Sequence, residues 1–339
     1  MIQEQADLTL MNTFQIRAKA RYYVEVDQVD TLKKIRQSDV FRDHKVMILG
    51  GGSNVIFTRD YDGLVIHPTL RGISVNPIGT GDQVLVTAAA GENWHDLVTY
   101  CVDHDIGGIE NLALIPGNCG AAPIQNIGAY GRELKDVLEW VDTIDLATGS
   151  SHRFEAEECQ FGYRDSLFKR PNGKKFFISS ITLRLTAKNH IIEASYSGLN
   201  EELQAFAGRP LTIRDIYSAV VSVRKRKLPD PQVTGNAGSF FKNPVISKIL
   251  FQKLQQEHPS IPFYIIDNQS IKIPAAWLIQ QAGWKGKQVG SVGVHARQAL
   301  VIINLGGASG QEILDLSERI QQDVLHKFSI QLEREVNII

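Results

Sequence analysis

Cysteine is scarce in this sequence of 339 residues, which contains only Cys101, Cys119 and Cys159. An odd number of widely separated cysteines without a C-x-x-C motif argues against a disulfide framework and against a zinc knuckle. The nine histidines include no H-E-x-x-H motif, so we expect no protein-bound catalytic metal. This use of cysteine is consistent with a reducing cytoplasm.

The sequence also lacks an excess of charge and a long apolar run. It has 36 Lys and Arg against 37 Asp and Glu, a formal net charge of -1, so no global basic field is present to hold nucleic acid. No apolar run approaches the roughly 18 residues of a membrane span, and the first ten residues do not resemble a signal peptide. We therefore expect a cytoplasmic, monomeric protein that neither inserts into a membrane nor binds nucleic acid.

The order of the predicted elements indicates an α+β protein with two or three domains. The clearest helix has Thr212 as its N-cap, Asp215 three residues later, and an end before Pro229. A further helix should open at Pro274. Other helices are predicted at 30–37, 92–104, 247–257 and 311–327, and strands at 22–26, 45–49, 55–57, 62–68, 84–91, 299–304 and 329–339.

The stretch "ILGGGSNVIF" contains the first glycine-rich loop. A Rossmann fingerprint requires a helix after the glycines, and a Walker loop requires a Lys-Ser/Thr pair, and neither follows here. Consecutive backbone N–H groups, with the Ser53 hydroxyl and the Asn54 amide, could bind a phosphate, although a plain tight hairpin fits the sequence equally well. The predicted cofactor contacts in this loop are Gly50, Gly51, Gly52, Ser53 and Asn54.

The second loop is "ENLALIPGNCGAAPIQNIGAYG", which spans residues 110–131 and has no charged residue after Glu110. It is too rich in glycine and proline for a regular element and too apolar for a solvated loop. A bound flavin would explain both properties, and a buried crossover between domains is the alternative. The predicted cofactor contacts here are Pro116, Gly117, Gly120, Ala121, Ala122, Gln125, Ile127 and Gly128.

Three further segments carry candidate reactive groups. In "FGYRDS", Arg164 could bind a carboxylate through two hydrogen bonds, or pair internally with Asp165. In "GNAGSFFKNP", the bulk of Phe241 excludes the esterase motif G-x-S-x-G, which leaves Ser239 as a reactive hydroxyl or as part of an ordinary turn. Between them, the basic run 224–227 ends a helix, where the dipole favours cations, and it suits a phosphate-bearing ligand better than nucleic acid.

Together and in this order, the motifs "GGGSN", "ENLALIPG", "PIQNIGAYG", "FGYRDS", "KLPDP", "GNAGSFFKNP" and "LEREV" resemble the UDP-N-acetylenolpyruvoylglucosamine reductase family, known as MurB. The resemblance extends over nearly the whole chain from Asn12. It implies the FAD-binding fold of vanillyl-alcohol oxidase, with two α+β subdomains and a third, α/β substrate-binding domain. We expect these at 1–70 (with a C-terminal strand at 328–339), 71–222 and 223–327.

The resemblance also implies the reaction. In that family, non-covalently bound FAD carries a hydride from NADPH to the enolpyruvyl ether of UDP-N-acetylglucosamine, which gives UDP-N-acetylmuramate for bacterial peptidoglycan. One alternative is another flavin-dependent oxidoreductase of this fold, which would keep the glycine loops but not "FGYRDS" with "GNAGSFFKNP". The other is a non-enzymatic sugar-nucleotide binding protein that has lost its flavin.

The family's functional residues map onto this sequence motif by motif. Ser239 matches the proton donor, and Arg164 and Glu335 match the two residues that stabilise the intermediate; from the sequence alone Glu335 reads as a solvated carboxylate on an alternating strand. The other matches are Tyr163 and Gln125 near the active site, Lys227 and Asn243 on the substrate, and Tyr196 on a loop that covers the substrate in one family type. Asn337 departs from the family, which commonly has a basic residue there, and Cys119 has no assigned role.

Overall fold

The computed structural model describes residues 1–339, except for the side chain of Ser197. The chain divides into two compact units, which we call the large unit and the small unit. The large unit comprises residues 1–6, 20–51 and 62–226, and the small unit comprises residues 7–19, 52–61 and 227–339. The predicted boundaries of three subdomains remain a prediction.

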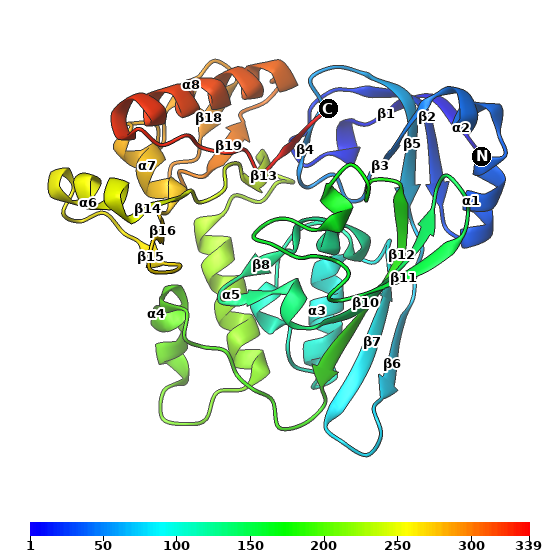
Figure 1. Cartoon of the computed structure of the whole chain (residues 1–339), viewed down its shortest axis with the longest axis horizontal. Helices are drawn as coiled ribbons and strands as arrows, with labels where there is room; N and C mark the ends of the chain where they lie inside the picture. The colour runs from blue at the N-terminus through cyan, green and yellow to red at the C-terminus, as the bar shows by residue number, and fades with distance from the viewer. The chain divides into compact units, whose positions relative to one another are not determined.

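The first sheet of the large unit has four strands in the order β1-β2-β5-β3 (Figure 1). Leu64 and Ile66 of β5 alternate with residues on the other face, and helix α1 adds the buried Leu32 and Ile35 to the same core. Strands β3 and β5 are parallel. The bounds are β1 Gln3–Asp7, β2 Lys19–Val26, β3 Lys45–Ile48, β5 Tyr61–Pro68, α1 Val29–Arg36 and α2 Asp39–Asp43.

The second sheet of the large unit is antiparallel, with five strands in the order β11-β10-β12-β7-β6. Helices α3 and α5 bury their apolar faces in the core of this sheet, as Val98 of α3 and Val220 of α5 illustrate. The bounds are β6 Ile73–Pro77, β7 Gln83–Ala89, β10 Leu138–Asp145, β11 Ser151–Glu155, β12 Phe176–Thr186, α3 Trp94–Asp103 and α5 Ile213–Lys227.

Short elements connect these parts of the large unit. The predicted flavin loop forms two 3-10 helices rather than a longer regular element, in agreement with its composition. The short elements are η2 Glu110–Leu112, η3 Cys119–Gln125, β8 Gly128–Ala129, β9 Arg132–Glu133, η4 Leu134–Asp136, η5 Leu167–Lys169, η6 Ser197–Leu199, α4 Asn200–Leu203 and η7 Gln204–Phe206.

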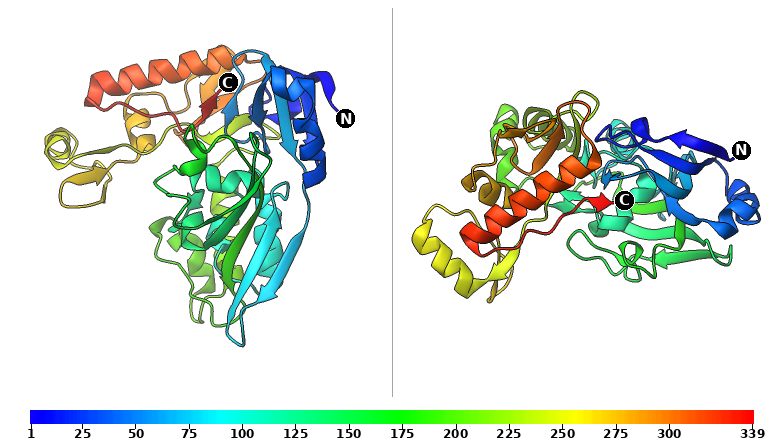
Figure 2. Two further views of the ribbon diagram at one scale, coloured as in Figure 1. Left: turned by 45° about the vertical axis from the view of Figure 1, so that its right-hand side comes forward. Right: turned by 90° about the horizontal axis from the view of Figure 1, so that it is seen from above.

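The small unit contains an antiparallel sheet in the order β13-β19-β18-β17, and the long helix α8 lies along it (Figure 2). Helix α8 begins with a capping box in which the side chains of Ser309 and Glu312 bond each other's backbone N–H groups. A separate three-stranded sheet, β14-β16-β15, packs on α6. The bounds are β13 Gly235–Ser239, β14 Val245–Ser247, β15 Tyr264–Ile265, β16 Ser270–Lys272, β17 Gln288–Val289, β18 Val292–Val294, β19 Val301–Asn304, η1 Thr9–Met11, α6 Lys248–Glu257, α7 Ala275–Gln281 and α8 Gly310–Phe328.

The predicted helices are all present, but the expected strand at 329–339 is wrong for most of its length, and one alternative for the glycine turn is excluded. The segment 329–339 is a strand only at β20, Asn337–Ile338, which pairs in parallel with β4, Val55–Ile56. The triple-glycine turn is not a hairpin, because β3 and β4 belong to different sheets. Hydrophobic alternation alone could not identify the pairing partners, which depend on tertiary contacts.

Among the described residues, no helix is long and apolar enough to cross a bilayer. The same part of the chain has no group of three or more His, Cys, Asp or Glu side chains arranged to hold a metal ion.

Candidate active site

The two predicted cofactor loops meet in the large unit. A Cβ atom built on Gly51 would lie 2.9 Å from Asn118 Oδ1 and 3.1 Å from Gly117 Cα, and one on Gly50 would lie 3.5 Å from the Cβ of Ala121. These distances place the backbone of one loop directly against the other, so a side chain at Gly51 would separate them. Gly51 is therefore needed for close approach, which is also what a cofactor bound along both loops requires.

The segment between β7 and helix α3 holds the second loop. The N–H of Cys119 donates to the carbonyl of Glu92 at 2.8 Å, and the N–H of Gly120 donates to the carbonyl of Ala90 at 3.0 Å. A Cβ on Gly120 would lie 2.6 Å from the Cβ of Ala90, closer than real Cβ atoms come. Because the N–H of Gly120 is used inside the protein, this residue would serve a cofactor by leaving room rather than by donating.

The second half of the first loop belongs to the small unit. Gly52 has φ +60°, and a Cβ there would lie 1.9 Å from the carbonyl oxygen of Met11. The N–H of Thr13 donates to the carbonyl of Gly52 at 3.1 Å, and the buried Asn12 amide bonds the carbonyls of Leu8 and Ile16, each at 2.9 Å. The segment around Asn12 therefore fixes the turn that presents Ser53 and Asn54.

Cys119 lies inside the second loop and is fully buried as a free thiol. Burial is the main cause that raises the pKa of this thiol far above its usual range. The sulfur therefore stays protonated and is a poor nucleophile. Its burial gives Cys119 a packing role and favours the expected non-covalent binding of the cofactor.

The side chain of Arg164, from the "FGYRDS" segment, contacts the second loop. Its guanidinium donates to the carbonyl of Gly128 at 2.7 Å and to that of Asn126 at 3.4 Å. Its backbone has φ +53°, a strained conformation of the kind that clusters at functional sites. Asp165, the residue proposed as an internal partner, pairs with Arg170 at 2.9 Å. The structure thus brings Arg164 together with Gly128, one of the predicted cofactor residues.

The buried side chain of Asn126 connects the segments that hold Arg164. Its Nδ2 donates to the carbonyl of Gly162 at 3.1 Å and to Glu133 at 3.2 Å, and its Oδ1 accepts the N–H of Lys135 at 3.0 Å. The "PIQNIGAYG" and "FGYRDS" motifs are therefore joined by one amide. Gln125 precedes this residue and is half-buried.

Arg224 is a site residue that the sequence analysis treated only as part of a basic run. Its Nε atom is buried and has no hydrogen-bond partner among the described residues, and its pKa is lowered, mainly by burial and also by the positive charge of Arg164. A hydrogen bond with Tyr130 opposes this shift. The signal was available, because Arg224 lies four residues after the buried Val220 on α5, whereas Lys225 and Arg226 are exposed.

Tyr196 and Tyr163, two predicted substrate residues, lie beside this pair of arginines. The ring of Tyr196 meets the ring of Tyr130 edge to face at 5.4 Å, and the Arg164 guanidinium lies 5.5 Å from the centre of the Tyr163 ring. Because Tyr130 also bonds Arg224, the large unit gathers two arginines and three tyrosines in one place. Such a set can bind an anionic ligand that also has apolar surface.

In the small unit, Ser239 is the exposed last residue of β13, and the buried Phe240 follows it. Gly238 has φ +67°, and its N–H donates to the Oδ1 of the buried Asn236 at 2.9 Å. Asn236 therefore shapes the bend before Ser239, and Phe240 anchors the chain after it. The serine hydroxyl is presented at a surface, and its reactive role remains a prediction.

Glu335 lies on the segment next to Ser239. Its N–H donates to the carbonyl of Phe240 at 2.9 Å, and its carbonyl accepts from the Asn54 side chain at 3.2 Å. The N–H and side-chain amide of Asn337 both donate to the carbonyl of Asn54, at 3.1 and 3.0 Å. Asn337, the departure from the family pattern, thus helps to support the backbone around Glu335.

The remaining predicted substrate residues lie apart along the small unit. Lys227 is the exposed last residue of α5, and the side-chain oxygen of Asn243 accepts the N–H of Ala275 at 2.9 Å at the start of α7. Asn243 thus has a structural role at this helix, and its NH₂ group is the part left for a ligand.

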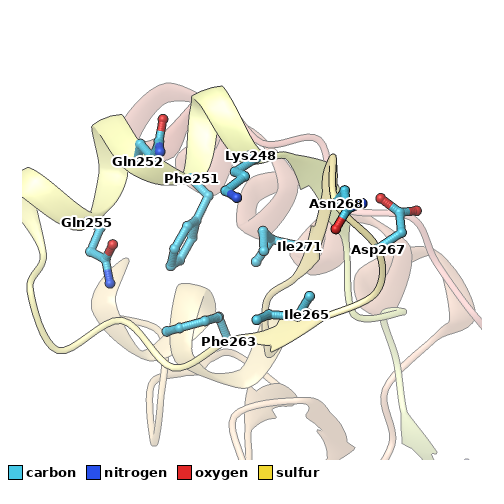
Figure 3. A pocket seen from close by; sticks show the side chains of 9 residues that line it. All are labelled: Lys248, Phe251, Gln252, Gln255, Phe263, Ile265, Asp267, Asn268 and Ile271. Carbon is cyan, nitrogen blue, oxygen red and sulfur yellow. The ribbon is translucent and has the colours of Figure 1, made fainter.

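A separate cavity of about 240 Å³ lies between α6 and the hairpin β15–β16 (Figure 3). The rings of Phe251 and Phe263 both line it and contact each other, with centroids 4.6 Å apart and planes inclined by 49°. It is smaller than the roughly 300 Å³ at which ligand pockets begin, and none of the predicted site residues lines it. We therefore do not assign the cofactor to this cavity.

Comparisons with known proteins identify the fold and the family. Residues 20–155 match the model of an FAD binding domain, and residues 230–339 match that of the C-terminal domain of UDP-N-acetylenolpyruvoylglucosamine reductase. The crystal structure of that reductase from Thermus caldophilus is similar with a TM-score of 0.67 at 22% identity, covering 100% of this chain and 98% of that chain. The fold and site thus define an FAD-dependent oxidoreductase with the vanillyl-alcohol oxidase fold.

Curated relatives define the family. The UDP-N-acetylenolpyruvoylglucosamine reductases of Flavobacterium johnsoniae and Bacteroides fragilis are 44% and 41% identical to this chain; both matches cover 100% of it, and 99% and 100% of the relatives. The chain belongs to the UDP-N-acetylenolpyruvoylglucosamine reductase family, as the sequence motifs indicated.

Proposed function

We propose that this protein reduces UDP-N-acetylglucosamine enolpyruvate to UDP-N-acetylmuramate, with FAD as the hydride carrier and NADPH as the reductant. The observation that carries the proposal is the placement of Arg164, which donates to the carbonyl of Gly128 at 2.7 Å in the predicted flavin loop. A guanidinium held there can bind the carboxylate of the enolpyruvyl group beside the flavin.

The residues present fit FAD. The close approach of Gly51 to Gly117, with a virtual Cβ only 3.1 Å from Gly117 Cα, offers the side-chain-free backbone that a pyrophosphate needs. The apolar stretch around Ile127 suits the flavin ring. When bound, FAD supplies hydride transfer between the nicotinamide and the substrate.

The chain's own residues would bind the substrate and manage its charge. Hydride addition to the methylene carbon leaves negative charge in the adjacent carboxylate, which the fork of Arg164 stabilises. The second cation, Arg224, adds positive charge in the same place: burial is the main cause that lowers its pKa, and the positive charge of Arg164 lowers it further. Tyr130 and Tyr196 supply ring surface beside these cations.

Ser239 would complete the reaction by donating a proton to the carbon next to the carboxylate. A serine hydroxyl is a weak acid, so the reaction requires groups that stabilise the alkoxide, and Lys227 and Asn243 are the proposed ones. Glu335 would assist from the neighbouring segment. Its N–H donates to the carbonyl of Phe240 at 2.9 Å, which holds the two segments together.

The experiment that tests this proposal is the absorbance spectrum of the purified protein, followed without oxygen while NADPH and then the enolpyruvyl sugar are added. We expect a flavin spectrum that bleaches with NADPH and returns with the sugar. Bleaching without return would indicate an oxidoreductase with a different substrate. A protein without a flavin band after FAD is supplied would instead be a sugar-nucleotide binding protein.

We also place the protein in the cytoplasm and expect a monomer. The three cysteines are all buried as free thiols, which is consistent with a reducing compartment. Sedimentation of the purified protein tests the oligomeric state.

A further inference from the structure

His95, in the first turn of α3, is held between α5 and the second cofactor loop. Its Nδ1 accepts the N–H of Leu114 at 3.1 Å, and its ring stacks on that of Tyr217 with centroids 5.9 Å apart. The Tyr217 hydroxyl bonds Thr99 Oγ1 at 2.9 Å, and Thr99 Oγ1 donates to the His95 carbonyl at 3.0 Å. Tyr217 of α5 therefore orients the imidazole, and the imidazole in turn accepts a hydrogen bond from the loop.

Leu114, which donates this hydrogen bond, has an unusual backbone conformation. It has φ +57° although it is not glycine, and Gly117 follows three residues later with φ +112°. A left-handed leucine is strained and persists only where its surroundings hold it. The bend at Leu114 comes just before Pro116 and Gly117, two predicted cofactor contacts, so it helps to set where they lie, together with the N–H of Trp94, which donates to the carbonyl of Gly117 at 3.0 Å.

The bond to Leu114 requires an unprotonated Nδ1, which is the neutral tautomer with its proton on Nε2. Burial lowers the pKa of His95, Lys225 and Arg224 on α5 lower it further, and Asp96 on α3 opposes them. The acceptor is thus maintained at neutral pH. Protonation would place an N–H at Nδ1 against the N–H of Leu114, so the hydrogen bond would be lost.

We propose that His95 is a positioning residue for the flavin: its Nδ1 holds Leu114 so that Pro116 and Gly117 can receive FAD, and protonation of His95 weakens that binding. The proposal rests on the proposed function only in taking this loop to contact FAD. It requires nothing of the sugar substrate.

The test measures the Kd of the full-length protein for FAD by equilibrium dialysis between pH 5 and 8. His95→Phe keeps a stacked ring but has no acceptor, whereas His95→Asn places an amide oxygen near the position of Nδ1 that cannot be protonated. We expect His95→Phe to bind FAD about threefold to tenfold more weakly at pH 8, as for the loss of one hydrogen bond. His95→Asn should bind FAD as the wild type does at pH 8.

The pH profiles carry the decisive comparison. When the pH is lowered past the pKa of His95, the wild type should lose affinity for FAD, and His95→Asn should not. Taking the ratio of the two affinities at each pH cancels any titration of FAD itself. His104→Asn is the matched control, because His104 is an exposed histidine at the end of the same helix, and it should leave the profile unchanged.

Two results would overturn the proposal. One is an unchanged FAD affinity in His95→Phe, and the other is a wild-type profile that parallels that of His95→Asn. If His95→Phe fails to fold, the second comparison still decides. The readout is FAD affinity alone, so an inability of the enolpyruvyl sugar to reoxidise the flavin would contradict the proposed function and leave this result standing.

Discussion

The two units present their proposed catalytic groups in different ways. In the large unit, Arg164 lies on irregular backbone, with left-handed conformations at Asn126, Tyr130 and Arg164 itself, and side-chain hydrogen bonds hold it. In the small unit, Ser239 ends a regular strand, and backbone bonds join the following Phe240 to Glu335 and to Leu300. The guanidinium of Arg164 is thus positioned by side-chain hydrogen bonds, whereas the hydroxyl of Ser239 is positioned by the backbone of a sheet. Changes to side chains should therefore have different consequences in the two units.

Removal of the Ser239 hydroxyl should have the largest effect. In Ser239→Ala, we expect reoxidation of the reduced flavin by the enolpyruvyl sugar to slow by about 10²–10⁴-fold, the usual contribution of general acid catalysis. Reduction by NADPH should be unchanged, because the strand that carries Ser239 is held by backbone bonds. Stopped-flow absorbance resolves the two steps. If the variant kept its full rate of reoxidation, Ser239 would not be the proton donor.

Arg164→Lys tests whether the fork or only the charge is needed. Lysine keeps the charge but cannot make the same paired hydrogen bonds, so we expect kcat/KM for the sugar to fall by about 10–100-fold, as for the loss of one charge-assisted bond. Arg170→Lys is the matched control, since Arg170 pairs with Asp165 on the surface, and its effect should be within about twofold. Equal effects in both variants would contradict the role of Arg164.

Substitutions at two glycines distinguish the two reasons for which a glycine is required: space for a neighbouring chain, and a left-handed backbone conformation. Gly120→Ala brings its Cβ within 2.6 Å of the Ala90 Cβ, so we expect a loss of about 1–3 kcal/mol in the free energy of unfolding and weaker FAD binding. In Gly238→Ala, the new Cβ has no atom within 4 Å, but the backbone has φ +67°. We therefore expect a loss of about 1–2 kcal/mol in the free energy of unfolding and unchanged FAD binding. Urea denaturation and dialysis measure both quantities. FAD loss in Gly238→Ala alone would reverse this assignment.

The smallest effect should come from the cap of α5. Asp215 accepts two bonds from Arg209, each at 2.7 Å, and the N–H of Thr212 at 2.8 Å, and the bond with Arg209 is the main cause that lowers its pKa well below the usual range. A lowered folded-state pKa gives stability above the unfolded pKa of about 3.9 that is lost as pH falls below it. Asp215→Asn should therefore cost about 1 kcal/mol at pH 7 and less at pH 3, as urea denaturation at both pH values would show. A constant difference would exclude the ionised carboxylate as its cause.

Local patterns predicted the helices because their signals lie within a few residues. The cap formed by Thr212 and Asp215 and the apolar spacing up to Val223 define α5 without reference to the rest of the chain. The irregular loop at 110–131 was predictable in the same way, from its glycines, prolines and lack of charge. Motif resemblance then indicated the family and placed candidate residues on the loops.

Other features were beyond local patterns. The alternation after Ser329 predicted a long strand, but only Asn337 and Ile338 form one, because their partner β4 has two residues. Arg224 is a different case, because its spacing of four residues after Val220 marks it on the helix, although the run of four basic residues drew attention away from it. The acceptor role of His95 was invisible, since Leu114 is 19 residues away.

The sequence by itself determined the elements, the folded, nearly neutral character of the chain and the family motifs, because propensity, capping and composition act over a few residues. The tertiary structure alone decided which backbone segments touch: Gly51 with Gly117, Arg164 with Gly128, and Glu335 with Phe240. These contacts join residues that are distant in the chain. Their geometry depends on close packing and on the pairing of buried polar groups across the whole unit, which no local pattern encodes.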